Sequence, residues 1–373
     1  MSEYNEKVPF IDLNAQLSKN RTNIDAAIAR VLDHGQFIMG PEVKKLETEL
    51  AAFSGAKYVL SCANGTDALT LALMAFGIGP GDAVFVPAFT YVASAEAPAQ
   101  LGAVPYFVDV DASSFNICPE SLKKAIIEAR EQGLNPSVII AVDLFGQPAR
   151  ATQLSTIAKE QNMRLLIDGA QSFGGSIDNE KVGTFGDITT TSFFPSKPLG
   201  CFGDGGAVFT QCEDLADLVN SIRLHGRGLS KYDNIRIGMN SRLDTIQAAV
   251  LLEKLKIFPE EIKRRSEIAA AYSAALGDIF TIPHLEQHLV SAWAQYTVRT
   301  KGRSEWMDRL NTVGVPSVVY YPKALSQQDG YKHYPIVSTG VNVSERLTDQ
   351  VMSLPMHPLL DVENVIERIL SCS

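Results

Sequence analysis

Three segments of the chain place reactive side chains and glycines directly after short apolar runs that favour β-strands. In the segment 192–206, Lys197 stands between Pro195 and Pro198, and four glycines follow it. A lysine held in such a loop and partly removed from water has a lowered pKa, so its free amine can form a Schiff base with a carbonyl carbon. The alternative is an ordinary lysine on the surface of the protein.

A carboxylate ends the apolar run Leu165–Asp168, and Gln171 follows three residues later. A carboxylate in this position can pair with a protonated ring nitrogen, and a pyridine ring whose nitrogen stays charged withdraws electrons from a bound substrate. The amide of Gln171 can hydrogen-bond a substituent of the same ring. The residues alone leave a second interpretation open, in which Asp168 merely caps the next helix.

The third segment runs from a predicted strand through Asn64, Gly65 and Thr66 into a predicted helix. Gly65 lets the backbone approach a ligand closely, and Thr66 adds a hydroxyl beside the exposed N–H groups at the helix start. A phosphate fits such a place. Taken alone, the same residues more often form only a turn and a helix cap.

Strand-like and helical patterns alternate from about residue 57 onward, which is typical of a largely parallel sheet flanked by helices. The predicted strands cover 58–61, 83–86, 104–108, 137–142, 164–167, 188–194 and 207–210. An earlier helix is predicted to begin at Pro41 and to stop at Gly55. Open α/β sheets bind ligands at the carboxyl ends of their strands, so the three reactive segments are expected to meet there.

Helical segments dominate after residue 210, and a second alternation of strands and helices begins near Trp293. The predicted elements of this part are helices at 242–256, 260–265 and 304–313 and strands at 296–299 and 317–320. We expect the charged run at 260–265 to face solvent. The pattern predicts two domains, a large one over 1–257 that includes the N-terminal segment and a smaller α/β domain over 258–373.

The 373 residues carry 33 basic and 42 acidic side chains, a formal net charge of −9. This charge disfavours binding to nucleic acid or to an anionic membrane, so neither is an expected partner. The five cysteines show no CxxC pair or zinc-like spacing, so neither a disulfide framework nor a metal site is predicted. We find no signal-peptide pattern and no run of transmembrane length, which makes a cytoplasmic location the default expectation.

Five motifs follow one another along the chain: NGTDAL, FTYVAS, DGAQSFG, TSFFPSKPLGCFGDGG and GMNSRLDTIQAA. Their order resembles that of the DegT-type sugar aminotransferases, which are fold-type I enzymes that depend on pyridoxal 5′-phosphate (PLP). The likeness runs from about Val8 to the C-terminus, and the lysine motif is highly specific. The resemblance implies a large domain with a mostly parallel sheet, a smaller C-terminal α/β domain, and PLP as the cofactor.

The resemblance also implies roles for the residues of the ring site. Lys197 is similar to the lysine that binds PLP covalently and moves a proton between the substrate carbon and the cofactor. Asp168 resembles the partner of the pyridinium nitrogen, and Gln171 resembles the residue near the ring hydroxyl. Lys197 and Asp168 are therefore the expected catalytic residues.

Five further residues are carried over as cofactor contacts. Gly65, Thr66 and Ser192 resemble the residues that hold the phosphate group. Phe89 is expected to stack on the cofactor ring, unless it is an ordinary core phenylalanine. Asn240 resembles a residue that completes the phosphate site of the neighbouring subunit, which implies a homodimer with shared active sites.

Arg242 and Tyr321 are the expected substrate-binding residues. A guanidinium can grip a carboxylate with two parallel hydrogen bonds, which suits glutamate as donor or an acidic sugar as acceptor. The alternative is that Arg242 pairs with Asp244 or Asp67 on the surface. Tyr321 lies in a loop that is expected to face the sugar.

Within the family, the chain is most similar to 3-aminotransferases that act on UDP-2-acetamido-2-deoxy-3-oxo-glucuronate for bacterial surface polysaccharide. One position departs from that pattern, because Tyr320 stands where a histidine is expected. Amine transfer to another UDP- or dTDP-linked keto-sugar stays open. A sugar dehydratase of the same fold has a histidine in place of the lysine, and a non-catalytic regulator has no need of Lys197 and Asp168, so both are disfavoured.

Overall fold

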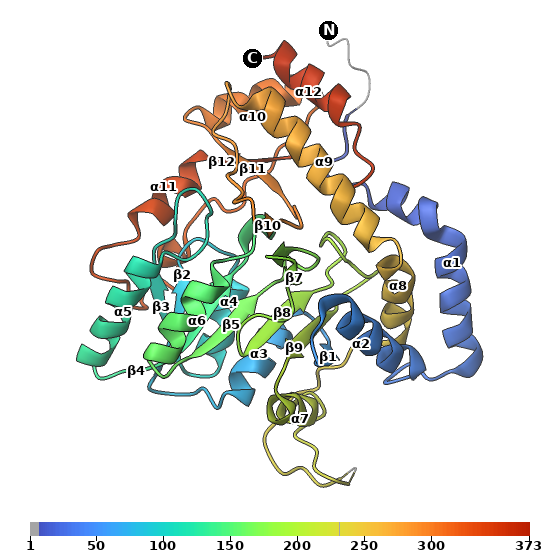
Figure 1. The fold of residues 1–373 in the computed structure, drawn as a ribbon, viewed down its shortest axis with the longest axis vertical. Helices are drawn as coiled ribbons and strands as arrows, with labels where there is room; N and C mark the ends of the chain where they lie inside the picture. Colours follow the sequence, from blue (N-terminus) through green and yellow to red (C-terminus); the bar gives the residue numbers. More distant parts are fainter. Residues whose placement is uncertain (1–6, 231) are drawn as a thin grey trace.

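A seven-stranded sheet forms the centre of the computed structural model, which describes residues 7–230 and 232–373 (Figure 1). Its strands are β1 (Tyr58–Cys62), β2 (Asp82–Pro87), β3 (Val104–Val108), β4 (Asn135–Val142), β5 (Arg164–Asp168), β8 (Ile188–Ser192) and β9 (Gly206–Thr210). Their order is β1-β9-β8-β5-β4-β2-β3, and only β9 runs antiparallel to its neighbours. All seven predicted strands and the mostly parallel sheet are confirmed.

Helices cover the sheet because most residues of its strands are buried, on both faces of the sheet. The helices of this part are α1 (Leu13–His34), α2 (Pro41–Ser54), α3 (Gly65–Ala75), α4 (Ala93–Gln100), α5 (Pro119–Glu131), α6 (Ala151–Glu160), α7 (Glu213–Ile222) and α8 (Thr245–Leu255). The predicted helix at Pro41 is confirmed, and Gly55 ends it in the left-handed conformation. Helices α3, α4 and α7 pack together, whereas α8 packs on α1 and α2.

The C-terminal part contains a small two-stranded sheet and four helices, which Figure 1 shows at the upper end of the molecule. Its elements are α9 (Phe258–Leu276), β11 (Tyr296–Arg299), α10 (Arg303–Thr312), α11 (Asn342–Gln350), β12 (Val351–Leu354) and α12 (Val362–Ser371). The predicted strand at 317–320 is wrong, because only an isolated bridge from Val318 to Ser353 forms there, and β12 is the partner of β11 instead. Among the described residues, no helix is both long and apolar enough to cross a membrane.

The two parts of the chain contact each other on both sides of the predicted boundary at residue 257. Residues of α9, β11, β12 and α12 share one hydrophobic cluster. However, Leu325 and Leu347 belong to the cluster of the large sheet, so the chain returns to that sheet after β11. At the other end, the backbone N–H of Val8 donates to the carbonyl of Gly314 at 2.9 Å. The division into 1–257 and 258–373 therefore stays a prediction.

Two helical predictions are corrected by the structure. The helix predicted at 242–256 begins only at Thr245, so Arg242 lies in an extended segment before it. The charged run 260–265 lies on α9 but does not face solvent throughout, since Glu261 is 9% exposed and Arg265 is 2% exposed. The guanidinium of Arg265 donates to the carbonyl of Trp293 at 2.9 Å, which holds α9 against the strand connections below it.

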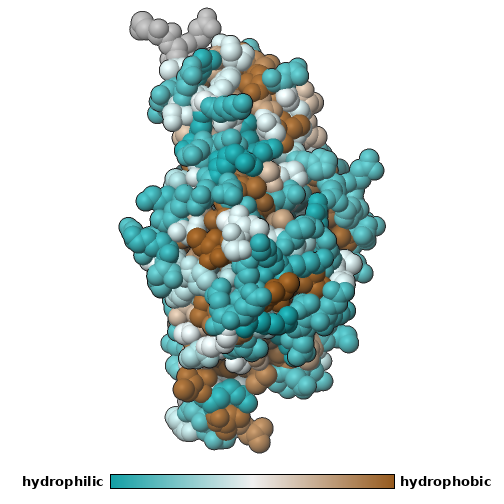
Figure 2. Space-filling model, turned by 90° about the vertical axis from the view of Figure 1, so that its left-hand side faces the viewer, coloured by the Kyte–Doolittle hydropathy of each residue, from teal (hydrophilic) through white to brown (hydrophobic). Residues whose placement is uncertain are grey.

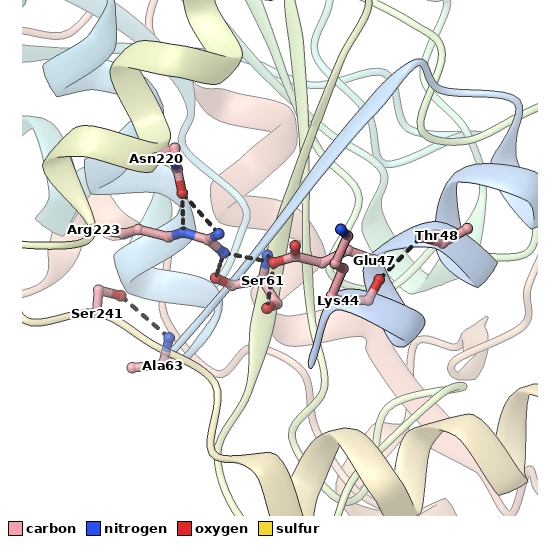
Figure 3. Close-up of polar contacts among 8 residues, drawn as sticks. All are labelled: Lys44, Glu47, Thr48, Ser61, Ala63, Asn220, Arg223 and Ser241. Atoms are coloured by element: carbon pink, nitrogen blue, oxygen red, sulfur yellow. Dashed lines mark hydrogen bonds and ion pairs between the residues drawn. The ribbon is translucent and has the colours of Figure 1, made fainter. Parts of the chain in front are cut away.

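A buried arginine joins three elements at the β1 edge of the sheet (Figure 3). Arg223, at the end of α7, donates to Glu47 of α2 and to the carbonyl of Ser61 in β1, both at 2.6 Å. Glu47 also accepts from the backbone N–H of Ser61 at 2.9 Å, and Asn220 accepts from the guanidinium. Arg223 is 3% exposed, so this network has a structural role and its charge is not available to a ligand.

We predict that Glu47→Ala lowers the stability of the protein by about 3 kcal/mol, because Arg223 then stays buried with an uncompensated charge. Glu47→Gln is the matched comparison, because its amide oxygen can still accept from the arginine but carries no charge. The difference between the two variants therefore gives the part of the loss that is due to the hydrogen bond. Thermal unfolding of the two variants beside the wild-type protein measures the effect. Equal melting temperatures for the alanine variant and the wild type would show that the ion pair is dispensable.

Candidate active site

Asp168 lies at the carboxyl end of β5 and is 7% exposed. Two donors hold its carboxylate: Oγ of Ser94 lies 3.0 Å from Oδ2, and the backbone N–H of Ala170 lies 3.2 Å from Oδ1. Ser94 belongs to α4 and Ala170 to the turn after β5, so two separate elements fix the orientation of the carboxylate. Burial raises the pKa of Asp168, whereas the two hydrogen bonds lower it.

Lys197 lies in the loop between β8 and β9, close enough to Asp168 for the two charges to act on each other. Burial lowers the pKa of the Lys197 amine, and the carboxylate of Asp168 raises it. The backbone N–H of Lys197 donates to the carbonyl of Phe194 at 2.8 Å, which closes the turn that carries the lysine. The structure therefore brings the two predicted catalytic residues together, with an amine whose free-base form is favoured by burial.

Gln171 and Tyr321 meet at the same site. Oε1 of Gln171 accepts the backbone N–H of Phe145 at 2.6 Å, and its Nε2 donates to the hydroxyl of Tyr321 at 3.3 Å. Burial raises the pKa of the Tyr321 hydroxyl, so it stays protonated. Tyr321 comes from the C-terminal part of the chain, and this contact joins that part to the loop after β5. The contact of Gln171 with a ring hydroxyl stays a prediction.

The start of α3 lies against the end of β8. A Cβ atom on Gly65 would lie 2.7 Å from Cβ of Ser192, so only glycine allows this close approach. The side chain of Asn64 accepts the N–H of Asp67 at 2.7 Å and caps the helix. In the described part of the chain, the backbone N–H groups of Gly65 and Thr66 find no acceptor. The segment is thus a helix cap that also leaves two donors free for an anion.

Two aromatic residues after β2 differ in exposure. Phe89 is completely buried, and its ring packs edge-on against Phe145 and Tyr321, with ring centroids 6.4 Å apart in both pairs. Tyr91 is 56% exposed, and its ring centroid lies 6.0 Å from that of Tyr321. A ring without exposed surface has no free face for a ligand. Stacking by Phe89 stays a prediction, and its burial counts against it.

Asn240 and Arg242 line a polar pocket of about 550 Å³, to which neither Asp168 nor Lys197 contributes. The lining residues include Asn64, Asp204, Asn240, Arg242, Asp244 and Gln247. The guanidinium of Arg242 donates to Oδ1 of Asn240. Within residues 7–230 and 232–373, Arg242 forms no ion pair, so the expected alternative of a pair with Asp244 or Asp67 is not realised.

The polar groups at the strand ends match three chemically different parts of PLP. A buried carboxylate suits a protonated ring nitrogen, an amine of lowered pKa suits an aldehyde, and the free N–H groups at the start of α3 suit a phosphate. No cluster of His, Cys, Asp and Glu that could hold a metal ion occurs among the described residues. A mostly parallel sheet with these groups at its carboxyl edge defines a PLP-dependent enzyme of fold type I.

Comparison with known proteins gives the family. The model of the DegT/DnrJ/EryC1/StrS aminotransferase family matches residues 18–371, and the chain belongs to this family. It is 46% identical to the UDP-2-acetamido-2-deoxy-3-oxo-D-glucuronate aminotransferase of Pseudomonas aeruginosa over 96% of this chain and 97% of that protein. The protein is thus a PLP-dependent aminotransferase.

Solved structures agree with this assignment. A family member from Brucella abortus is 48% identical, covers 98% of this chain and 99% of its own, and superposes with a TM-score of 0.96. NtdA of Bacillus subtilis, solved with its bound cofactor PMP, has a TM-score of 0.89 at 28% identity and covers 100% of this chain and 87% of its own.

Asp143 was missed by the motif analysis although it directly follows β4, the neighbour of β5. Its Oδ2 accepts from Oγ of Ser172 at 2.5 Å, and its Oδ1 accepts from the N–H of Ala149 at 2.8 Å. Burial raises the pKa of this carboxyl to about 7. The sequence did contain a signal, because the apolar run 138–142 ends in an aspartate just as the run before Asp168 does.

Ser94 and Tyr91 were missed for a different reason. Both lie in the FTYVAS motif, in which the sequence suggests a cofactor contact for the phenylalanine alone. The motif does not reveal that the helix α4 turns the hydroxyl of Ser94 toward Asp168, or that the ring of Tyr91 stays exposed while that of Phe89 is buried. These directions follow only from the packing of α4 on the strand ends.

We predict that the stability of the Asp143→Asn variant, relative to that of the wild-type protein, increases as pH rises. The folded protein holds a proton on Asp143 up to about pH 7, whereas an unfolded aspartate loses it near pH 4, so wild-type stability falls with rising pH across that window. Asparagine mimics the protonated carboxyl and does not titrate. The melting temperature of the variant should exceed that of the wild type by a few degrees at about pH 8, and the gap should close at about pH 5. A gap that does not change with pH contradicts the prediction.

Proposed function

We propose that this enzyme transfers the amino group of glutamate to the keto group of UDP-2-acetamido-2-deoxy-3-oxo-glucuronate, in the biosynthesis of a bacterial surface polysaccharide. The observation that supports this choice most strongly is the 46% identity, over nearly the whole of both chains, to a protein with that named activity. The guanidinium of Arg242 lines an open polar pocket without an ion pair among the described residues, which is consistent with an acidic sugar. A cytoplasmic location stays a prediction.

The chain's own residues divide the work between two half-reactions. The chemistry that PLP supplies when bound is to take up an amino group from a donor and release it to an acceptor. Asp168 holds the proton on the ring nitrogen, since its carboxylate is oriented by Ser94 and Ala170. The amine of Lys197 removes the α-proton of glutamate and later returns a proton to the sugar carbon. The N–H groups of Gly65 and Thr66 bind the phosphate group, with Ser192 beside them.

Tyr91 is a better candidate than Phe89 for the ring that stacks on the cofactor. The ring of Tyr91 is exposed and lies beside Tyr321, whereas the buried ring of Phe89 contacts Tyr321 edge-on. In this arrangement Phe89 does not contact the cofactor. It packs against Tyr321, whose hydroxyl accepts a hydrogen bond from Gln171. Tyr320, which stands where the family pattern has a histidine, lies in the loop proposed to face the sugar and does not take part in these contacts.

The working unit in this proposal is a homodimer with shared active sites. A loop that contains residues 226–230 and 232–237 projects beyond α7 at the lower end of the molecule (Figure 1), and Figure 2 shows hydrophobic residues gathered at that end. This loop is called the hairpin below. Its exposed apolar residues are Leu229, Ile235 and Ile237. A second copy of the chain would cover them. Asn240 and Arg242 follow this hairpin in the chain, so they can serve the partner's site.

Two alternatives differ in what they predict for the purified enzyme. Another UDP- or dTDP-linked keto-sugar would leave the glutamate half-reaction unchanged and alter only the acceptor. A non-catalytic regulator would bind PLP without converting it. A panel of UDP- and dTDP-linked keto-sugars, incubated with enzyme and glutamate and read by mass spectrometry, separates these cases. The proposal expects amine transfer to the acidic UDP-sugar in preference to its neutral counterpart, and a preference for the neutral sugar would overturn it.

We predict that Arg242→Ala lowers kcat/KM for the acidic sugar roughly 10- to 100-fold, the cost of losing hydrogen bonds to a charged group. The glutamate half-reaction, followed by cofactor absorbance without sugar, should stay near the wild-type rate. Arg242→Lys is the matched control, because it keeps the charge but not the two parallel donors. If the glutamate half-reaction alone slows, Arg242 binds the donor carboxylate and not the sugar.

A further inference from the structure

Ser94 is a completely buried serine whose hydroxyl contacts the catalytic carboxylate. Its Oγ donates to Oδ2 of Asp168 at 3.0 Å, and Oγ1 of Thr90 lies 3.4 Å from Ser94 Oγ. Ser94 stands in the first turn of α4, between Ala93 and Ala95. Small residues on both sides let this turn lie directly against the end of β5, so the backbone of α4 fixes where the hydroxyl points.

The hydroxyl supplies half of the hydrogen bonding of this carboxylate. Among the described residues, Ser94 is the only side chain that donates to Asp168, and the other donor is the backbone N–H of Ala170. A buried carboxylate that loses a donor becomes harder to ionise, because burial already favours its neutral form. A neutral carboxyl at position 168 cannot hold a positive charge on a ring nitrogen.

We propose that Ser94 is a positioning residue that keeps the carboxylate of Asp168 ionised and aimed at the ring nitrogen of PLP. This inference rests on the cofactor role proposed above for Asp168. Ser94 does not touch the substrate and acts only through the carboxylate. Thr90 supports it from the far side, where its hydroxyl can pair with that of Ser94.

Three other titratable groups face Asp168 and have to be separated from the effect of Ser94. Lys197 favours the charged carboxylate, whereas Asp143 and Tyr321 interact with it from the end of β4 and from the C-terminal part. Asp143 has its own donors in Ser172 and Ala149, so removal of the Ser94 hydroxyl leaves its surroundings intact. The Asp143→Asn background removes its titration and isolates that of Asp168.

The sign of the expected pH effect follows from the hydrogen bond. Loss of the Ser94 donor raises the pKa of the carboxyl, so a higher pH is needed to ionise it. The acid limb of the pH profile for the glutamate half-reaction should therefore move to higher pH in Ser94→Ala, by about one unit. The affinity of the apoenzyme for PLP at neutral pH should fall roughly 10-fold, as expected for a lost hydrogen bond to a charged group.

The experiment compares three variants of the full-length holoenzyme. Ser94→Ala removes the donor, Ser94→Thr keeps a hydroxyl at the same position, and Ser54→Ala removes a buried serine hydroxyl of α2 that donates only to the carbonyl of Leu50. PLP affinity is measured by titration of each apoenzyme, and the pH profile by cofactor absorbance after addition of glutamate, with each profile repeated in the Asp143→Asn background.

The proposal expects weaker PLP binding and a shifted acid limb in Ser94→Ala, recovery of both in Ser94→Thr, and wild-type values in Ser54→Ala. Wild-type PLP affinity together with an unshifted acid limb in Ser94→Ala would overturn the proposal. Equal losses of PLP affinity in the alanine and threonine variants would also overturn it, because they would indicate a packing role for Ser94. If the wild-type enzyme binds PLP but glutamate never changes its absorbance, the proposed function fails, while the affinity measurements still decide the role of Ser94.

Discussion

The site depends on keeping a carboxylate charged in a place from which water is excluded. Asp168 is buried at the end of β5, where desolvation alone would make it take up a proton. The fold opposes this with a hydroxyl from α4, a backbone N–H from the turn after β5, and the charge of Lys197. Each comes from a different element, so the first turn of α4, the end of β5 and the lysine loop have to keep fixed relative positions. A parallel sheet provides this rigidity because the carboxyl ends of its strands are adjacent.

A second constraint links the start of α3 to the segment before α8. Oγ of Ser241 accepts the N–H of Ala63, which directly precedes the turn at Asn64 and Gly65 (Figure 3). The N–H of Ser241 in turn donates to the carbonyl of Arg223, whose guanidinium holds β1 and α2. The residues on both sides of Ser241 are those proposed to reach a partner subunit. One short segment would therefore position the phosphate turn of its own chain and complete the site of the other.

The sequence predicts most of this arrangement because its chemistry lies where strands end. Apolar runs that finish in Asp168 or lead into Gly65 locate reactive groups along the chain, and the parallel topology then brings them together without further information. The glycine at position 65 is an example of a specific requirement, since Ser192 leaves no room for a side chain. Lys197 was predicted from the loop and its motif, and the structure places its charge beside Asp168.

What the sequence does not predict is the direction of side chains that depend on packing between distant elements. Phe89 and Tyr91 are both aromatic residues of one motif, and the sequence does not distinguish their positions. In the structure Phe89 is buried in the core, whereas Tyr91 is exposed. The sequence predicts that the charged run on α9 faces solvent, but Glu261 is buried. The positive charges of Arg265 and Lys254 offset part of the cost of burying its carboxylate. Lys254 in turn donates to the carbonyl of Gly200 at 2.5 Å, in the loop that carries Lys197. Lys254 thus fixes one carbonyl of the glycine-rich loop that carries Lys197, and the charges of the run on α9 act on Lys254 instead of facing solvent throughout.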